Sequence, residues 1–536
     1  MAERASFRAG VARKTGRKLV VFKDAQGSDA AGVRALSGAK VQLARSSDFS
    51  GAVPASAFSQ GDGVLFEEIG VAVLAPTSSR GVSVAEVLET TPGVTLEDER
   101  IRYVSGGFWD SPEAGAEYLR GYRDGVNRLI DALLEQAGVR QVEAAVAGVN
   151  EKTITWGLAA TLAARSPFTG RGVKVAVLDT GIDLTHPDFA DRDIVSECFV
   201  DGEEVQDGHG HGTHTAGTAC GPRSPARLPR YGVACDAKLY VGKVLGDDGS
   251  GGDGMILNGI NWALKNGCRV ISMSLGSQSP PSDSYEEAGR RALLKGAILI
   301  AAAGNESERS SGMIAPVGSP ANAPSIMAVG AVDVNMEIAD FSCAGRKSDP
   351  PGRQVDIAGP GVDVLSSYKG GRRIRLSGTS MATPHVAGLA ALLLEANPGL
   401  TGRQLWDLLT STSKRLSLPV TDVGAGLAQA PVSEPPGKTT SVPDKDVETP
   451  PAFTPSNAPT AQVAIVVDSA YSDRFGEVEA RAKAVGLTSS TALLEVNQIT
   501  GQIAVDKLAA LKAVEGVKSV SISKGIALPP PEAPVQ

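Results

Sequence analysis

The chain has 536 residues, of which 42% are hydrophobic and 21% are charged, and its formal net charge is -8. That length is too great for one ordinary hydrophobic core and favours about two to four domains of a globular protein. The sequence holds no dense run of lysine and arginine and no stretch near the roughly 18 apolar residues of a membrane span. Both observations argue against nucleic acid and membranes as partners.

The N-terminal end and the cysteines bear on the compartment of the protein. Residues 1–20 are basic but include no apolar run of signal-peptide length, so we expect a cytoplasmic protein, or one secreted without a cleavable signal peptide. The five cysteines are odd in number and include no Cys-x-x-Cys pair. We therefore expect neither a disulfide framework nor a cysteine-based zinc site.

A small α+β domain is predicted over residues 18–104, after an N-terminal stretch, 1–17, that we expect to be disordered. Apolar runs predict strands over 18–22, 64–75 and 94–104, and a short helix over 82–89. A helical linker, 105–152, is expected next, because an apolar stripe at helical spacing runs through residues 112–137.

Strands and helices alternate through the central part of the chain, residues 153–430. Apolar runs of buried-strand type cover residues 173–178, 238–245, 270–275 and 297–303, and helical patterns cover 255–266, 284–295 and 382–394. Such alternation predicts an α/β domain with a mostly parallel sheet and helices on both faces.

The C-terminal part has a linker and a second small domain. Residues 431–460 are rich in Pro, Thr and Ser and predict an extended linker, and residues 529–536 form a Pro-rich tail. Between them, residues 461–528 show the order strand, helix, strand, strand, helix, strand, with runs at 461–467, 473–485, 491–496, 502–505, 506–515 and 517–522. This is the element order of a small ferredoxin-like domain.

Two titratable residues of the central domain stand in contexts suited to catalysis. Asp179 follows a buried strand, and functional groups gather at the carboxyl ends of parallel strands. A carboxylate there can orient a histidine such as His211, although an aspartate before glycine is also an ordinary turn residue. His209 and His214 raise a zinc site as an alternative, but glycines interrupt the usual ligand spacing and the nearest carboxylate is Asp207.

A nucleophile and a second polar group follow later in the chain. Ser380 precedes a long apolar helix pattern, and Gly378 permits a tight turn into that helix. Backbone N–H groups at a helix N-terminus favour a developing oxyanion, whereas the simpler alternative for this serine is an N-cap. Asn305 follows a buried strand and Gly304 and can direct its amide to the same oxyanion, although Gly-Asn is also a turn signal.

These residues occur in the order Asp, His, Asn, Ser within one α/β unit. The stretches 176–183, 211–217 and 378–385 around them resemble the three signature stretches of subtilisin-family serine proteases, and the resemblance covers residues 153–430. The resemblance implies that Ser380 is the nucleophile and that His211 is a general base that later acts as an acid. It also implies that Asp179 orients the histidine and that Asn305 forms an oxyanion hole together with the Ser380 backbone N–H.

The resemblance also implies where a substrate binds. A substrate strand is expected to pair beside two segments: Ser274, Leu275 and Gly276, and Gly249, Ser250 and Gly251. The pocket for the residue before the scissile bond is expected between residues 301–304 and 317–318, which include Gly304 and Gly318. Its small apolar lining predicts cleavage after medium or large apolar residues.

No cofactor is assigned, and calcium is the one candidate that stays open. Residues 221–231, where the resemblance places a calcium loop, are basic and lack carboxylates. Calcium needs hard oxygen ligands, so this loop is a poor site, whereas Asp188 is a candidate ligand elsewhere.

Both flanking units also resemble a known fold, that of the subtilisin propeptide and inhibitor. The likeness is closer for residues 461–528 than for 18–104, and two unrelated ferredoxin-like domains are the alternative. The resemblance implies a serine endopeptidase that hydrolyses protein or peptide substrates through an acyl-enzyme. We expect an autoinhibited zymogen, held shut by its flanking domains, that cuts itself between Val104 and Phe168.

Two other classes of function are weighed against this one. A transpeptidase or macrocyclase shares the triad and differs only in whether an amine or water resolves the acyl-enzyme. A non-catalytic interaction protein would have a broken triad, and this triad is intact.

Overall fold

The computed structural model describes residues 13–23, 41–54, 56–75, 93–104, 151–227, 229–345, 353–432, 460–467, 475–493, 498–504, 507–512, 514–515 and 517–522. The chain divides into two compact units, Met1–Gly437 and Lys438–Gln536, and each is described by itself. The predicted helix over 82–89, the helical stripe through 112–137, the tail and nearly all of the predicted linker 431–460 lie outside the described residues. The predicted domain boundaries stay predictions.

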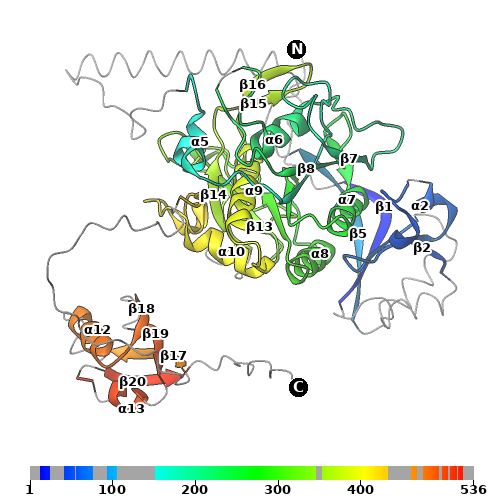
Figure 1. Ribbon diagram of the computed structural model, residues 1–536. Coiled ribbons are helices and arrows are strands. Elements are labelled where there is room, and N and C mark those ends of the chain that lie inside the picture. Colours follow the sequence, from blue (N-terminus) through cyan, green and yellow to red (C-terminus); the bar gives the residue numbers. More distant parts are fainter. Residues whose placement is uncertain are drawn as a thin grey trace, which may run out of the picture. The chain divides into compact units, whose positions relative to one another are not determined.

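A seven-stranded parallel sheet forms the centre of the first unit (Figure 1). Every pair of neighbouring strands in it is parallel. The predicted α/β fold with a mostly parallel sheet is therefore confirmed. In spatial order the strands are β14 (Ile357–Pro360), β13 (Met327–Val332), β12 (Ile298–Ala302), β10 (Val270–Met273), β6 (Lys174–Asp179), β8 (Lys238–Lys243) and β7 (Val195–Cys198).

Helices cover both faces of this sheet because successive side chains of a strand point in opposite directions. Val175 and Val177 of β6 pack in one core with α6 (His211–Cys220) and α9 (Thr379–Ala396). Ala176 and Leu178 pack in the other core with α7 (Asp253–Lys265) and α8 (Asp283–Leu294). Strand β6, which ends at Asp179, is thus buried on both sides.

The helices and strands predicted for the central part of the chain match the structure to within a few residues. One predicted strand is divided in two, and several elements were missed. The run 270–275 divides into β10 and a two-residue strand, β11 (Leu275–Gly276), because β10 pairs within the central sheet whereas β11 pairs with β5 (Val94–Val104). The elements that were not predicted include helices α6 and α10 (Gly402–Ser411) and strands β7, β13, β14, β15 (Val364–Tyr368) and β16 (Arg372–Leu376). Helix α6 has no apolar stripe, since all of its residues are buried and glycine, threonine and histidine make up most of it.

The N-terminal part forms a second sheet in this unit. Its strands lie in the order β5 (Val94–Val104), β1 (Lys14–Phe22), β4 (Val71–Leu74), β3 (Gly63–Phe66) and β2 (Leu43–Arg45). Strand β1 begins before the predicted residue 18, and the run 64–75 is two antiparallel strands. The assignment of this part to the ferredoxin-like class stays a prediction.

The N-terminal sheet packs on α7 and α8, which lie beside β1 and β5 (Figure 1). Phe66 and Val73 of this sheet share one hydrophobic core with Ile256 of α7 and Ala288 of α8. All four side chains are fully buried, so the two parts are joined by continuous apolar packing.

Strand β5 also provides caps for the two helices that it crosses. The N-cap residues of α7 and α8 make no side-chain cap of their own. Glu97 accepts hydrogen bonds from the backbone N–H groups of Asp283 and Ser284, at 2.5 and 3.2 Å, and Glu99 accepts one from Gly254, at 2.8 Å. A Cβ atom at Gly254 would lie 2.7 Å from Glu99 Oε1, so glycine makes this approach possible. Two carboxylates thereby satisfy helix N-termini of the central domain.

The second unit is a four-stranded antiparallel sheet with two helices. Its strands lie in the order β18 (Thr488–Leu493), β19 (Gln498–Ala504), β17 (Thr460–Val467) and β20 (Val517–Ile522), with α12 (Phe475–Ala484) and α13 (Leu508–Lys512) between strands along the chain. Val463, Ile465 and Val467 alternate along β17 and bury against Val478 of α12 and Leu511 of α13. The inhibitor-like role of this unit stays a prediction.

All five cysteines are free thiols, and Cys198 is the one that is not buried. None of the helices in the described part of the chain is long and apolar enough to cross a membrane.

Replacing the Glu97 carboxylate tests its role as a cap. In a chain carrying Ser380→Ala, which removes the nucleophile expected from the sequence, Glu97→Ala is expected to lower the free energy of unfolding by about 1 kcal/mol, because the N-terminus of α8 loses its acceptor. Thermal unfolding followed by circular dichroism measures the shift in Tm. Glu337→Ala, at an exposed position, is the matched control, and an equal Tm for both variants would contradict the capping role.

Candidate active site

Asp179 and His211 form a buried hydrogen-bonded pair. Asp179 ends β6, His211 begins α6, and Asp179 Oδ1 lies 2.7 Å from His211 Nδ1. The carboxylate also accepts hydrogen bonds from Thr180 N, at 2.8 Å, and from Thr215 Oγ1, at 3.1 Å. Asp179 is fully buried, so these donors hold it in one orientation toward the imidazole.

The histidine keeps its second nitrogen for chemistry. Burial lowers the pKa of His211, but the charge of Asp179 and its hydrogen bond outweigh this and raise the pKa above its usual value of 6.5. Nε2 is buried and has no hydrogen-bond partner among the described residues. A carboxylate at Nδ1 with an open Nε2 is the arrangement of a general base that later donates the proton as an acid.

Asp207 fixes the start of helix α6, and its role was not predicted. Its carboxylate accepts hydrogen bonds from the backbone N–H groups of His209, Gly210 and Thr213, at 3.1, 2.6 and 2.8 Å. From the sequence, Asp207 was considered only as a metal ligand. An aspartate a few residues before a helix start is also a common acceptor for the first N–H groups, and that signal was available.

Close backbone packing explains the glycine after His211. A Cβ atom at Gly212 would lie 2.2 Å from the carbonyl oxygen of Gly181, which is backbone and cannot rotate away. The helix can therefore approach the turn after Asp179 only because residue 212 is glycine.

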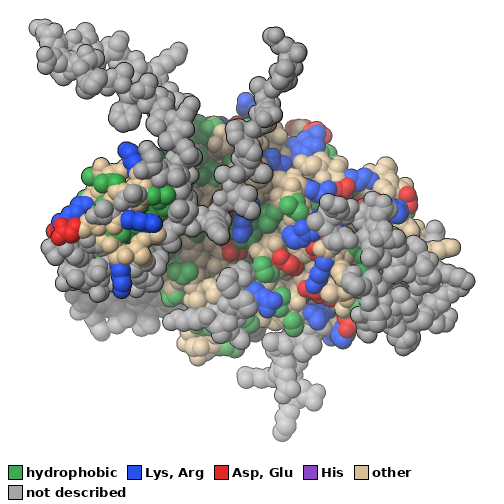
Figure 2. Space-filling model, turned by 90° about the horizontal axis from the view of Figure 1, so that it is seen from below, with side chains coloured by type: hydrophobic (Ala, Val, Ile, Leu, Met, Phe, Trp, Pro, Cys, Tyr) green, Lys and Arg blue, Asp and Glu red, His purple; other side chains and the backbone are tan. Residues whose placement is uncertain are grey.

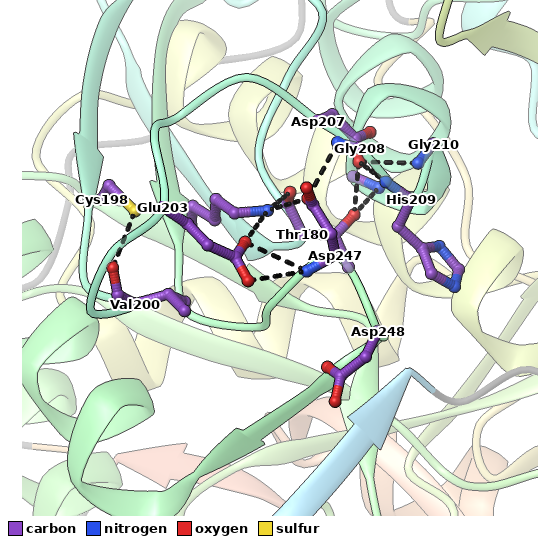
Figure 3. A network of polar contacts seen from close by, with 12 residues as sticks. Thr180, Cys198, Val200, Glu203, Asp207, Gly208, His209, Gly210, Asp247 and Asp248 are labelled. Carbon is purple, nitrogen blue, oxygen red and sulfur yellow. Dashed lines mark hydrogen bonds and ion pairs between the residues drawn. The ribbon is translucent and has the colours of Figure 1, made fainter.

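A buried lysine ties this turn to the loop before α6 (Figure 3). Lys243 Nζ donates to the carbonyl oxygen of Thr180 at 2.7 Å and pairs with Asp247 at 2.6 Å and Glu203 at 3.1 Å. Asp247 in turn accepts a hydrogen bond from Gly208 N at 2.9 Å. The segments that carry Asp179 and His211 are thus held by one polar network.

Ser380 lies in the first turn of α9, where it bonds to Ser274. Its Oγ donates to the Ser274 carbonyl oxygen at 3.1 Å, and Ser274 Oγ donates to the Ser380 carbonyl oxygen at 2.8 Å. Pro384 has no N–H to bond that carbonyl within the helix, so Ser274 supplies the missing donor. Because α9 packs against α6, the serine and the histidine lie at the N-terminal ends of two neighbouring helices.

Asn305 is oriented by the residue before Ser380. Its Oδ1 accepts hydrogen bonds from Thr379 N at 2.8 Å and Thr379 Oγ1 at 2.9 Å. Only the carboxamide oxygen can accept from a backbone N–H, so the NH₂ group is on the opposite side. This orientation suits the predicted oxyanion hole.

The predicted substrate-binding segments flank strand β5. Segment 274–276 contributes β11, in which Leu275 pairs with Val104 and Gly276 with Tyr103. The other segment contributes β9 (Ser250–Gly252) and Gly249, whose carbonyl oxygen accepts a hydrogen bond from Val104 N at 2.9 Å. Both pairings are antiparallel, with Tyr103 opposite Ser250 and Arg102 opposite Gly251. The N-terminal part of the chain therefore supplies the strand that lies between β9 and β11, where a substrate strand was expected.

Gly304 and Gly318 were predicted to line the pocket for the substrate residue before the scissile bond. They lie on adjacent backbone segments, because Gly318 N donates a hydrogen bond to the Ala303 carbonyl oxygen at 2.9 Å. Polar groups lie close by. A Cβ atom at Gly304 would be 2.5 Å from Glu306 Oε2, and Gln278 Nε2 bonds that same oxygen at 3.0 Å. The surroundings are more polar than the small apolar lining expected from the sequence.

Two of the residues considered for metals, His214 and Asp188, are held by protein partners. His214 Nε2 bonds to the carbonyl oxygen of Val364 at 3.0 Å, and burial lowers the pKa of His214 to about 3. Asp188 accepts hydrogen bonds from Tyr231 Oη at 2.6 Å and from the Arg373 guanidinium at 2.7 Å. A carboxylate already neutralised by a guanidinium does not fit a calcium ligand, so we derive no step through calcium.

The fold and the site together define a class: a serine hydrolase whose Asp–His pair and serine sit at the carboxyl end of a parallel sheet. A family model described as the Subtilase family matches residues 170–434. Subtilisin BL of Lederbergia lenta is 43% identical over 284 residues, which cover 52% of this chain and 98% of that protein. Subtilisin E of Bacillus subtilis (strain 168) is 44% identical over 249 residues, covering 46% of this chain and 62% of that protein.

Among solved structures, a cold adapted subtilisin-like serine proteinase is 33% identical with a TM-score of 0.43 and covers 52% of this chain and 97% of that one. The chain belongs to the subtilase family, and it is a subtilisin-like serine endopeptidase.

The raised pKa of His211 gives a pH-dependence with a defined sign. The neutral imidazole accepts the proton, so kcat/KM is expected to fall as the pH drops through a value above 6.5. Asp179→Asn is expected to lower kcat by about 10⁴-fold, the size known for this change in other enzymes with the triad, and to move the acid limb to lower pH. Hydrolysis of an uncharged peptide ester across pH measures both. Asp193→Asn, on the surface, is the control, and an unshifted limb in Asp179→Asn would refute the assignment.

The proposed donor role of Asn305 is separable from its bonds to Thr379. Asn305→Ala is expected to reduce kcat by about 10²- to 10³-fold with little change in KM, because the oxyanion loses a donor. Asn305→Asp keeps an oxygen that accepts from Thr379 N but replaces the NH₂ group. Its kcat is expected to fall at least as far as that of Asn305→Ala. Steady-state kinetics of both variants provide the check; near-normal kcat in Asn305→Asp would show that Asn305 acts only on local structure.

Proposed function

We propose that this endopeptidase is made as a zymogen whose N-terminal part blocks the substrate cleft until the enzyme cuts itself beyond Val104. The observation that carries the proposal is the place of strand β5, which lies between β9 and β11 as the middle strand of an antiparallel ladder. A peptide substrate is expected to bind the same two strands, so β5 and a substrate exclude each other.

The register of β5 indicates where a substrate bound in the same way would present its scissile bond. Val104 pairs with Leu275, so in an antiparallel ladder the next residue of a substrate faces Ser274. Ser274 bonds to Ser380 through both its hydroxyl and its carbonyl group. A peptide bond at that position is therefore the one most exposed to attack.

The chemistry then follows from the site. Ser380 Oγ attacks the scissile carbonyl carbon as its proton passes to His211 Nε2, and Asn305 with the Ser380 backbone N–H stabilises the oxyanion. His211 gives the proton to the leaving amine as the C–N bond breaks, which leaves an ester on Ser380. Water attacks this ester, loses a proton to His211, and the acid product departs as Ser380 regains its hydrogen.

The charges on one face of the molecule give no indication of a nucleic-acid partner. Figure 2 shows acidic and basic side chains interspersed on the face in view, without a wide patch of either sign. The transpeptidase alternative gains no support, since the relatives that the chain matches are subtilisins and alkaline proteases.

Self-cleavage is tested by expressing wild type and Ser380→Ala side by side. Wild type is expected to yield a shorter chain with a new N-terminus between residues 105 and 168, whereas Ser380→Ala stays full length because it lacks the nucleophile. Mass spectrometry and N-terminal sequencing measure this, and a fluorophosphonate probe should label wild type alone. A full-length wild type that is fully active would contradict the zymogen proposal, and identical processing of both chains would assign the cut to another protease.

A further inference from the structure

The side chain of Arg102 is completely buried in the substrate cleft. Arg102 pairs with Gly251 of β9, and its side-chain exposure is 0%. Its neighbour Tyr103 is 41% exposed, as expected where successive side chains of a strand alternate. A guanidinium without water is costly unless partners satisfy its charge and its N–H groups.

The surrounding pocket provides such partners. Arg102 Nε lies 2.5 Å from Asp253 Oδ1, and Nη2 lies 3.4 Å from Asp253 Oδ2, which makes the contact two-pronged. Nη1 donates to Ser277 Oγ at 2.8 Å and to Ser279 Oγ at 2.7 Å. The charge and most of the hydrogen-bonding capacity of the guanidinium are thereby met.

An aromatic ring completes the pocket. The Arg102 Cζ atom lies 5.3 Å from the centre of the Tyr285 ring, within the range of a cation–π contact. Tyr285 Oη also donates to Asp253 Oδ1 at 2.9 Å and so holds the carboxylate in place. The pocket is therefore shaped for a planar cation.

Every pocket residue belongs to the central domain and borders the cleft. Asp253 directly follows β9, and Ser277 directly follows β11. Among the described residues, Arg102 is the one cation that pairs with Asp253. Once β5 leaves, the cleft retains this carboxylate without its cation, and a bound substrate would bury it again.

We propose that this pocket selects arginine in substrates, at the position three residues before the one that supplies the scissile carbonyl. The inference rests on the proposed function, because it assumes that substrates bind in the register of β5. That register places Val104 opposite Leu275 and the following substrate residue opposite Ser274, so Arg102 marks the third position before it. Arginine is preferred over lysine because the planar fork matches the carboxylate and the ring.

The test uses quenched fluorescent decapeptides with the chain's own sequence 100–109, Arg-Ile-Arg-Tyr-Val-Ser-Gly-Gly-Phe-Trp. The third residue is Arg, Lys, Leu or citrulline, which keeps the shape of arginine without its charge. The enzymes are the full chain after self-processing, Asp253→Asn, and Asp248→Asn as a control that removes an equal charge from a neighbouring exposed position. Mass spectrometry locates each cut.

Wild type is expected to cleave the Arg peptide after its Ser, with a kcat/KM about tenfold or more above that of the citrulline peptide, since an unpaired buried carboxylate is unfavourable. Asp253→Asn should abolish this ratio while still cleaving the citrulline peptide, which shows that it folds, and Asp248→Asn should keep the ratio. Ser277→Ala removes one acceptor and should reduce the ratio of kcat/KM between the Arg and citrulline peptides a few-fold. This variant replaces Asp253→Asn in the test if Asp253→Asn does not fold.

The failures are distinguishable. Equal cleavage of all four peptides by wild type, or a ratio that survives Asp253→Asn, overturns the arginine pocket and leaves the proposed protease intact. Absence of cleavage of every peptide, with Ser380 unlabelled by the fluorophosphonate probe, contradicts the proposed function and the pocket together.

Discussion

The pairing of strand β5 with β9 and β11 is the interaction on which the arrangement of the first unit depends. It aligns the N-terminal sheet with the substrate cleft through backbone hydrogen bonds, which are nearly independent of side chains. The side chains then add specific contacts. Glu97 and Glu99 cap α8 and α7, and Arg102 enters a pocket of the central domain. One strand therefore supports two helices of the central part, and under the proposed function it also occupies the substrate cleft.

The catalytic groups are positioned by segment ends rather than by long side chains. Asp179 ends a strand, whereas His211 begins a helix and Ser380 lies in the first turn of one. Each such end exposes backbone groups that need partners, and here Asp207 satisfies α6 while Ser274 satisfies the carbonyl that Pro384 cannot. The same contacts that complete the helices thus limit the movement of the reacting atoms, which is the preorganisation that catalysis needs.

Local sequence patterns predicted four strands of the central sheet, β6, β8, β10 and β12, and the candidate catalytic residues, but missed β7, β13 and β14. Buried strands are continuous apolar runs, and the Asp, His and Ser stretches are long enough to be specific. Local patterns do not predict contacts between segments that are far apart in the sequence. The buried pair of Arg102 and Asp253 joins residues 151 positions apart, and each alone reads as an ordinary surface charge. Helix α6 was missed because a fully buried helix of small residues has no amphipathic stripe.

In the proposed zymogen, a buried ion pair would let the cleft discriminate between residues without binding its N-terminal strand very tightly. The Coulomb attraction between Arg102 and Asp253 is largely offset by the desolvation of both charges, so the pair adds little net affinity. A residue without a cation, however, leaves the carboxylate of Asp253 buried and unpaired, which is strongly unfavourable. Selectivity can therefore be large where affinity is modest. In the proposed zymogen, strand β5 would therefore dissociate once its covalent link is cut, and a substrate with arginine at the same position would replace it.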